Sequence, residues 1–234
     1  MFVTALVDLP AFGPDAARRL SQAAGLSLRQ AADCLQVPLR GPVVAGHHPE
    51  RAAAEAQQAA LEAAGFHPLV VGPPWLPAVQ AQQVVVVGDS LVVMLEAGER
   101  LVIQGDEVQL LVWGTRVLPP GAVVEQVPRV PGERPSGRRR TPTEHREGLL
   151  RLFLRTGPVV RIDAGVVAGL DDHAFTLLVR AVRRACSGAL LDDRLLARRT
   201  QEQILGVDLK PEVHLDLAVV LVALARGWRH HPGG

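Results

Sequence analysis

Strand and helix signals alternate along the first 73 residues, and this alternation limits the possible folds more than any other feature of the chain. The predicted strands and helices cover, in mixed order, residues 3–9, 14–25, 26–35, 41–46, 49–65 and 66–71. Pro14 and Pro49 open two of the helices, whose first turn tolerates proline, and Ser27 suits an N-cap. The resulting order β-α-α-β-α-β predicts an antiparallel or mixed sheet with the helices packed on one face.

After a proline-bearing linker at 74–83, the predicted elements become short strands separated by turns. The Gly-Asp pair at 88–89 and the later EAG and QGDE segments have compositions typical of hairpin turns. The strands cover residues 84–87, 90–95, 99–103, 108–117, 148–154 and 158–163. A helix over 171–186 follows, so the pattern predicts a mostly antiparallel, barrel-like domain at 84–186 with a capping helix.

The last segment, 187–234, predicts a C-terminal extension with helices at 192–205 and 215–228. The second helix is apolar almost all the way round, so it must be buried. It packs either on its own chain or in an interface with a partner, where Trp228 would be a suitable anchor. The chain is therefore expected to be an α+β protein with a small domain at 1–73, the barrel-like domain and the C-terminal helices.

Composition excludes several classes of protein. With 48% hydrophobic residues among 234, the chain is too apolar to remain disordered. A net charge of +1 gives no global field that would attract nucleic acid or a membrane surface. The two cysteines share no short motif. No signal-peptide pattern occurs at the start of the sequence, and the apolar segment 215–225 is too short to span a bilayer. We therefore expect a cytoplasmic protein in a reducing compartment.

Two segments of the first domain carry a family resemblance. Residues 25–35 read GLSLRQAADCL, and residues 54–71 read AEAQQAALEAAGFHPLVV. Both resemble the C-terminal domain of the bacterial ribosomal stalk protein, whose fold is shared with the Clp protease adaptor. The resemblance implies that fold here. In the stalk family a basic face on the first helices contacts translation GTPases, and Arg18, Arg19 and Arg29 fall near that face.

The segment 84–186 combines a series of short strands with one C-terminal helix. LVVMLEAGERLVI, LLRLFLRTGPVVRID and the helix after Leu170 are similar to a bacterial pleckstrin-homology-like domain. Phosphoinositide binding in that superfamily needs basic residues on the early hairpin loops, whereas GDS and EAGE are acidic here. The resemblance therefore favours protein binding or self-association over lipid binding.

The tetrapeptide at 88–91, Gly-Asp-Ser-Leu, matches the signature of the GDSL esterases, in which a serine at a strand end attacks an ester. Such a nucleophile needs a histidine base, an orienting acid and oxyanion donors. The chain has no asparagine to act as a donor, and it lacks the Asp-x-x-His element of that family. A hairpin turn is therefore the favoured interpretation, and catalysis by Ser90 is the alternative.

Two histidine pairs allow structural and metal-binding interpretations. His47 and His48 precede a helix and suit a solvated helix start, and a metal site that includes Glu50 is the alternative. The pair at 230–231 has no carboxylate or cysteine neighbour, so it suits an exposed tail better than a metal site.

Other polar groups fit local structure without any chemistry. Asp171 and Asp172 suit a helix N-terminus, where carboxylates cap free N–H groups. Cys34 and Cys186 lie on apolar helix faces and suit small buried side chains. No Walker loop, dinucleotide fingerprint or Cys-x-x-Cys element occurs, so the sequence predicts no cofactor.

Charge is distributed unevenly along the second domain. Residues 78–118 hold two arginines and five acids, a balance of −3, whereas 119–151 hold seven arginines and four glutamates, a balance of +3. The Arg- and Pro-rich part at 119–147 predicts an exposed, mobile loop. Its arginines suit a solvated loop, an acidic protein surface or nucleic-acid phosphates, although no aromatic residues are interleaved for base stacking.

Taken together, the residues favour a non-enzymatic cytoplasmic module that holds a protein partner or assembles with itself. The alternatives are an esterase that uses Ser90 and a nucleic-acid-binding protein that uses the loop arginines. The candidate partner-binding residues are Arg18, Arg19, Arg29, Arg138, Arg139, Arg140 and Trp228.

Overall fold

The α+β class is confirmed by the computed structural model. It describes residues 1–36, 41–73, 75, 78–96, 98–118, 146–167, 170–206 and 208–229. Within these residues the chain forms a three-stranded sheet, a seven-stranded sheet and six α-helices. Residues 119–145 of the predicted loop, which include Arg138, Arg139 and Arg140, lie outside the described residues, as does the histidine pair at 230–231. The last two residues assigned to that loop, Arg146 and Glu147, instead begin strand β8, where they pair with β7.

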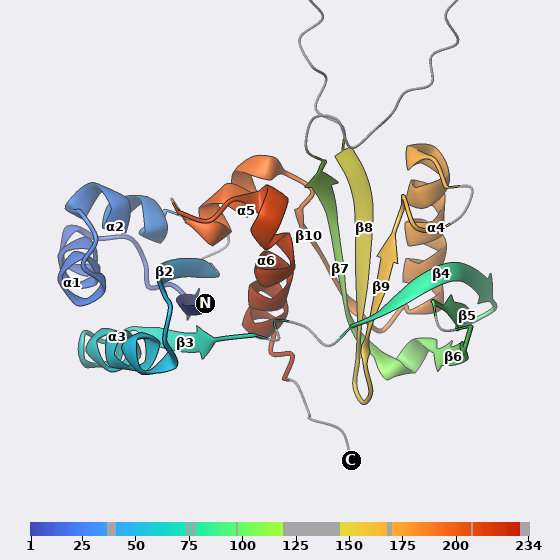
Figure 1. Ribbon diagram of the computed structural model, residues 1–234, viewed down its shortest axis with the longest axis horizontal. Helices are drawn as coiled ribbons and strands as arrows, with labels where there is room; N and C mark the ends of the chain where they lie inside the picture. The colour runs from blue at the N-terminus through green and yellow to red at the C-terminus, as the bar shows by residue number, and fades with distance from the viewer. Residues whose placement is uncertain are drawn as a thin grey trace, which may run out of the picture.

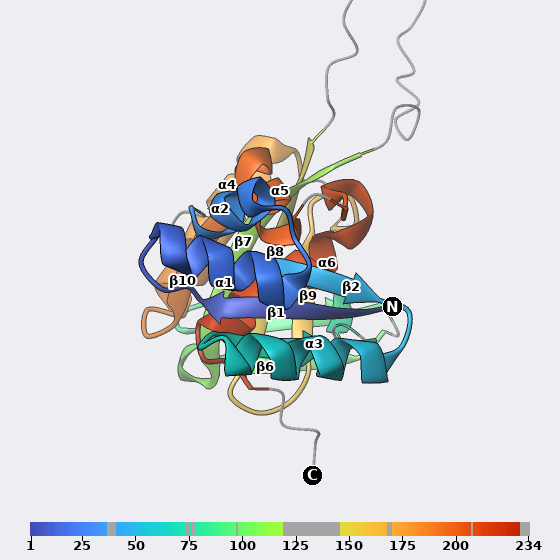
Figure 2. The same ribbon diagram turned by 90° about the vertical axis from the view of Figure 1, so that its left-hand side faces the viewer.

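The first 73 residues follow the predicted β-α-α-β-α-β order. The elements are β1 (Phe2–Asp8), α1 (Pro14–Ala24), α2 (Leu28–Leu35), β2 (Val43–His48), α3 (Arg51–Ala63) and β3 (His67–Val71). The strands pair antiparallel in the order β2-β1-β3. A capping box starts α2, because the Gln30 amide donates to Ser27 Oγ and the Ser27 amide donates to Gln30 Oε1. The three helices lie on the side that Figure 2 turns to the viewer.

The second sheet is open and is not closed into a barrel. Its strand order is β10-β7-β8-β9-β4-β5-β6, so β10 and β6 are its edges. The strands are β4 (Ala78–Val87), β5 (Ser90–Leu95), β6 (Arg100–Gln104), β7 (Val108–Val117), β8 (Arg146–Leu154), β9 (Val159–Asp163) and β10 (Leu190–Leu195). Neighbours pair antiparallel except β4 with β9 and β10 with β7, which pair parallel. The short 3-10 helix η2 (Gly105–Glu107) links β6 to β7.

Two further predictions along the second domain and the C-terminal extension are wrong. Strand β4 begins at Ala78, so the second half of the predicted linker is strand, and Gln80 there donates a side-chain hydrogen bond to the Arg161 carbonyl. The helix predicted at 192–205 is instead β10 followed by α5 (Arg198–Leu205). The polar residues of these two segments do not favour a strand locally, but pairing with neighbouring strands and ion pairs stabilise the strand conformation.

Helix α6 (Pro211–Ala225) is the central layer of the molecule (Figure 1). One hydrophobic cluster joins it to Val3 and Ala5 of the small sheet and to Leu110 and Val112 of the large one. The prediction that this helix is buried is confirmed, and its partner is its own chain. Since both sheets pack on α6, the two parts of the chain share one core.

Helix α4 (Asp172–Ala185) packs on the opposite face of the large sheet from α6 (Figure 1). Its inward side chains Phe175, Val179 and Val182 join a second cluster that includes Leu91 and Ile103 of the β5–β6 hairpin. As predicted, Asp171 caps this helix, since its Oδ1 accepts a hydrogen bond of 2.7 Å from the Ala174 amide. The inner face of β4, β5 and β6 is thereby covered by α4.

Candidate functional site

The outer face of β4, β5 and β6 exposes valines where an antiparallel sheet usually places polar residues. Its central row is Val85, Val92 and Val102, which are register partners across the three strands. Val87 lies one row further along β4. Val85, Val87 and Val102 are 45%, 58% and 47% exposed, so these side chains face solvent. We call Val85, Val87, Val92, Met94 and Val102 the valine face.

The turns around the valine face carry negative charge. Asp89 lies in the β4–β5 turn, and Glu96 and Glu99 lie in the β5–β6 turn, all three exposed. Arg100 is the basic residue on this outer face, in the register row of Met94. Apolar surface bordered by turns of mainly negative charge is typical of an interaction surface for a partner of the opposite charge.

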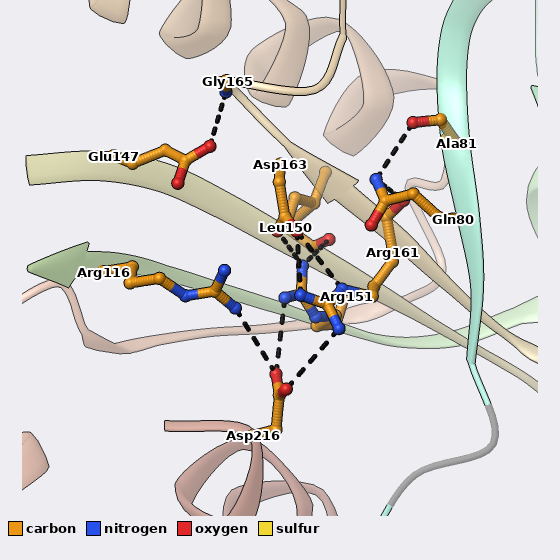
Figure 3. A network of polar contacts seen from close by, with 10 residues as sticks. All are labelled: Gln80, Ala81, Arg116, Glu147, Leu150, Arg151, Arg161, Asp163, Gly165 and Asp216. Carbon is orange, nitrogen blue, oxygen red and sulfur yellow. Dashed lines mark hydrogen bonds and ion pairs between the residues drawn. The ribbon is translucent and has the colours of Figure 1, made fainter. Parts of the chain in front are cut away.

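A buried ionic network lies on the face of the large sheet that α6 covers (Figure 3). Arg151 of β8 is fully buried and donates from Nη1 to Asp163 Oδ1 of β9 at 2.6 Å. Asp163 also accepts two hydrogen bonds from Arg161, at 3.0 and 3.2 Å. Asp216 of α6 lies 3.5 Å from Arg151 Nη2, 3.5 Å from Arg161 Nη1 and 3.8 Å from Arg116 Nη2. The network therefore fastens the first turns of α6 to three strands.

The pKa values of the network follow from burial and pairing. Burial alone would raise the pKa of Asp163, but the Arg151 and Arg161 guanidinium groups hold it below its ordinary value. Burial lowers the pKa of Arg151, and the Asp163 carboxylate opposes that change. Each group is stabilised in its charged form by its partner, which is the behaviour of a structural ion pair.

A second ionic cluster fixes the other end of α6. Asp192 of β10 is buried and accepts hydrogen bonds from Arg194 and from Arg226, the residue after α6, the latter at 2.7 Å. Arg194 Nη1 also donates to the Gly41 carbonyl in front of β2. The cluster therefore connects both sheets and the C-terminal end of α6. Its role is to hold the two parts of the molecule together.

Cys34 and His47 line a narrow cleft between α2, β2 and the segment after α5. The cleft has a volume of about 40 Å³, room for a water molecule and not for a substrate. His47 Nδ1 lies 3.8 Å from Asp208 Oδ2. Burial, with a smaller contribution from Asp33, raises the pKa of the Cys34 thiol to about 11. A thiol of that pKa remains protonated near neutral pH and is a poor nucleophile.

Both cysteines should therefore react slowly with a thiol reagent. Burial raises the pKa of Cys186 to about 11 as well. At pH 8 we expect iodoacetamide to alkylate the folded protein at least tenfold more slowly than the urea-unfolded chain, because the thiol pKa is about 11 in the folded protein and about 8.5 in an unfolded chain, so far less thiolate is present. Mass spectrometry of the alkylated protein measures both rates. Fast alkylation of Cys34 in the folded protein would contradict this account of the cleft.

Ser90 lies at the first position of β5, where the prediction of a hairpin is confirmed. Val87 and Ser90 are register partners, and Gly88 between them has a φ of +59°, as a tight hairpin turn requires. Ser90 Oγ donates to Gln104 Oε1 at 2.7 Å. Within the described residues, no hydrogen bond joins this hydroxyl to a histidine, the residue that most often activates a serine nucleophile.

The histidine pair before α3 is divided between different partners. His48 Nε2 lies 2.9 Å from Gln57 Oε1, and His47 faces Asp208. Glu50 is the N-cap residue of α3. Within the described part of the chain, no three His, Cys, Asp or Glu side chains gather in an arrangement that would hold a metal ion.

The other predicted partner residues occupy different environments. Arg18 is exposed and lies 4.0 Å from Asp15, and Arg29 is exposed on α2. Arg19 bonds to the Ala64 carbonyl at 2.8 Å and stacks over the Phe66 ring, so it holds α1 against the end of α3. Trp228 is 6% exposed and packs edge-on against Phe153, with 4.9 Å between ring centroids. Its indole belongs to the core, so it is not available as a surface anchor.

The valine face could be anticipated only in part. The strands predicted at 84–87, 90–95 and 99–103 with hairpin turns between them occur as β4, β5 and β6, although β4 begins earlier, and valine fills both the inward and the outward positions. Without alternation between apolar and polar residues, nothing in the sequence identifies the solvent side. The role of Asp216 also depends on tertiary structure, because its partners lie on three distant strands.

Comparison with protein-family models, curated proteins and solved structures finds no match for this chain. Among the helices of the described ranges, none combines the length and hydropathy needed to span a bilayer.

Proposed function

We propose that this protein is a non-catalytic interaction module that binds another folded protein through the valine face. The observation that carries the proposal is the exposure of Val85, Val87 and Val102 on one sheet face. Large apolar patches cost solubility, and monomeric proteins seldom expose them without a use. The function is therefore attributed to a surface.

The chemistry of the valine face defines the kind of partner. A three-stranded antiparallel face accepts a flat or convex apolar surface, such as one side of a helix. Asp89, Glu96 and Glu99 favour positive charge around the apolar centre of that partner. The matching surface is therefore an apolar side chain or stripe flanked by arginine or lysine.

The polar interior supports this proposal. The carboxylates with lowered pKa values, Asp163 and Asp192, are held by arginines. The arginines that hold Asp163 lie on the adjacent strands β8 and β9, and Asp192 also contacts Arg226 at the end of α6. Cys34 and Cys186 have raised pKa values that disfavour nucleophilic chemistry. These groups have structural explanations, which leaves the exposed surface as the best-supported functional element.

An affinity-capture experiment tests the proposed function. Wild type, Val85→Lys/Val102→Lys and the control Val213→Lys are immobilised and exposed to extract of the source cells. Val213 is 75% exposed on α6, so its variant matches the change in charge away from the valine face. We expect the double variant to capture at least tenfold less of a partner protein than the wild type does, because burying the exposed half of each valine contributes roughly half of the about 1.5–3 kcal/mol of a complete side chain. Equal capture by all three baits, or no capture by wild type, would contradict the proposal.

A further inference from the structure

Helix α4 exposes an apolar side chain among arginines on the side that faces away from the sheet. Leu177 is 49% exposed, and Arg180, Arg183 and Arg184 on the following turns are exposed as well. Positions 177, 180 and 184 follow the helical spacing of i, i+3 and i+7, so they form one stripe. We call Leu177, Arg180, Arg183 and Arg184 the arginine stripe.

The charges of the arginine stripe have no partner within the part of the chain that the structure describes. No ion pair or side-chain hydrogen bond joins Arg180, Arg183 or Arg184 to another described residue, whereas Arg151, Arg161 and Arg194 are all paired. Asp172, in the first turn, is the acidic residue of α4. The stripe is therefore an apolar centre next to uncompensated positive charge.

The arginine stripe has the chemistry that the valine face requires of its partner. One surface is apolar with acidic turns, Asp89, Glu96 and Glu99, and the other is apolar with basic residues. The stripe is a convex helix surface, and the valine face is a sheet surface on which a helix can pack. Arg100 is the like charge on the valine face that a helix would have to avoid.

We infer that the partner of the valine face is the arginine stripe of a second copy of this chain. The inference rests on the proposed function and names the partner that the same face binds. A contact between two valine faces is the alternative form of self-association, but it would bring the acidic turns of both copies together. Like charges across an interface are unfavourable, so opposite charges select the contact between helix and sheet.

The placement of the two surfaces makes the contact head-to-tail. Helix α4 packs on the inner face of β4, β5 and β6, so its arginine stripe and the valine face point to different sides of the molecule. In a pair, the arginine stripe of one copy and the valine face of the other therefore remain unused. Such a heterologous contact continues into a chain of copies, or closes into a ring if the rotation allows.

Two complementary variants separate this contact from the alternatives. The sheet-face variant is Val85→Lys/Val102→Lys, and the helix-face variant is Leu177→Glu/Arg180→Glu. All four side chains are exposed, so both variants should fold as the wild type does, which circular dichroism checks. Controls of matched chemistry are Val213→Lys on α6 and Arg29→Glu on α2.

Light scattering gives the mass of each sample. We expect the masses of the wild type and of both controls to exceed the monomer mass of 25.0 kDa and to rise with protein concentration. At high salt the rise should be smaller, because salt screens exposed charges. Each variant alone should remain monomeric. A mixture of the two should reach twice the monomer mass and stop there, since one intact stripe meets one intact valine face.

Three results would overturn the inference. They are a monomeric wild type at all concentrations, a mixture that remains monomeric, and a helix-face variant that associates as well as the wild type. The third result would assign the contact to two valine faces and leave the proposed function intact. If the wild type is monomeric, the capture experiment still decides whether the valine face binds a different protein, so the two proposals fail separately.

Discussion

Replacing Asp163 with alanine is expected to lower the free energy of unfolding by about 3 to 5 kcal/mol. The substitution leaves the Arg151 guanidinium fully buried without its closest carboxylate, 2.6 Å away in the wild type. Asp216 remains 3.5 Å from Arg151 Nη2, but a buried charge that loses its closest partner is still far more costly than the loss of an exposed ion pair. Urea unfolding monitored by circular dichroism measures the difference.

Two variants test whether that loss comes from the buried charge. Arg51→Ala removes an exposed pair of similar length, Arg51–Glu55 at 2.8 Å, and should change stability by less than about 1 kcal/mol. Replacing both buried partners, as Arg151→Met/Asp163→Leu, should recover most of the loss, because apolar side chains carry no charge that burial would penalise. The replacement also removes Arg151 Nε, which is buried without a hydrogen-bond partner among the described residues. A cost below about 1 kcal/mol for Asp163→Ala would contradict this account.

The same contact has a defined pH dependence. The Asp163 carboxyl titrates near its ordinary pKa of about 4 in the unfolded chain and at a lower pH in the folded protein. Between these values the unfolded state binds more protons, so the contribution of Asp163 is fully present above pH about 4 and is lost as pH falls through the folded pKa. The stability of Asp163→Asn should therefore fall less steeply with acid than that of the wild type.

The second large effect is expected at the centre of α6. Leu221 is fully buried in the cluster that joins the two sheets, so Leu221→Ala should cost about 2 to 5 kcal/mol through lost burial and a cavity. Val213→Ala on the same helix is the matched control, because Val213 is 75% exposed and its variant should stay within about 0.5 kcal/mol.

The position of Leu221 also predicts which strands lose protection from hydrogen exchange in this variant. Since α6 packs on both sheets, hydrogen exchange of amides in β1 and β7 should accelerate together in Leu221→Ala. If only one sheet lost protection, or the variant were as stable as the control, α6 would not be the shared core of the molecule.

Local chemistry explains which parts of the fold could be predicted from the sequence. Pro14, Gly25 and Ser27 mark helix ends by properties of the residues themselves: α1 begins at Pro14 and ends before Gly25, and Ser27 is the N-cap of α2. The Gly-Asp turn at 88–89 predicts its hairpin for the same reason, because Gly88 adopts a positive φ.

The remaining features depend on contacts between residues far apart in the chain. Asp192 and Arg194 are poor strand formers, and β10 exists because Arg226 and the neighbouring strand β7 complete their surroundings. The sequence predicts Trp228 as a candidate surface anchor, because its contact with Phe153, 75 residues earlier in the chain, cannot be inferred from local sequence. The open edges of the large sheet likewise follow from strand order, which no local pattern determines.

The central claim is that the valine face is the surface through which this protein contacts another, and methyl NMR tests it most directly. Spectra of valine- and leucine-labelled protein are recorded from dilute to concentrated solution and assigned with single substitutions. We predict that the signals of Val85, Val92 and Val102 on β4–β6 and of Leu177 on α4 shift or broaden together, while that of Val213 stays constant. Valine-face methyls that do not change while the molecular mass rises would contradict the account.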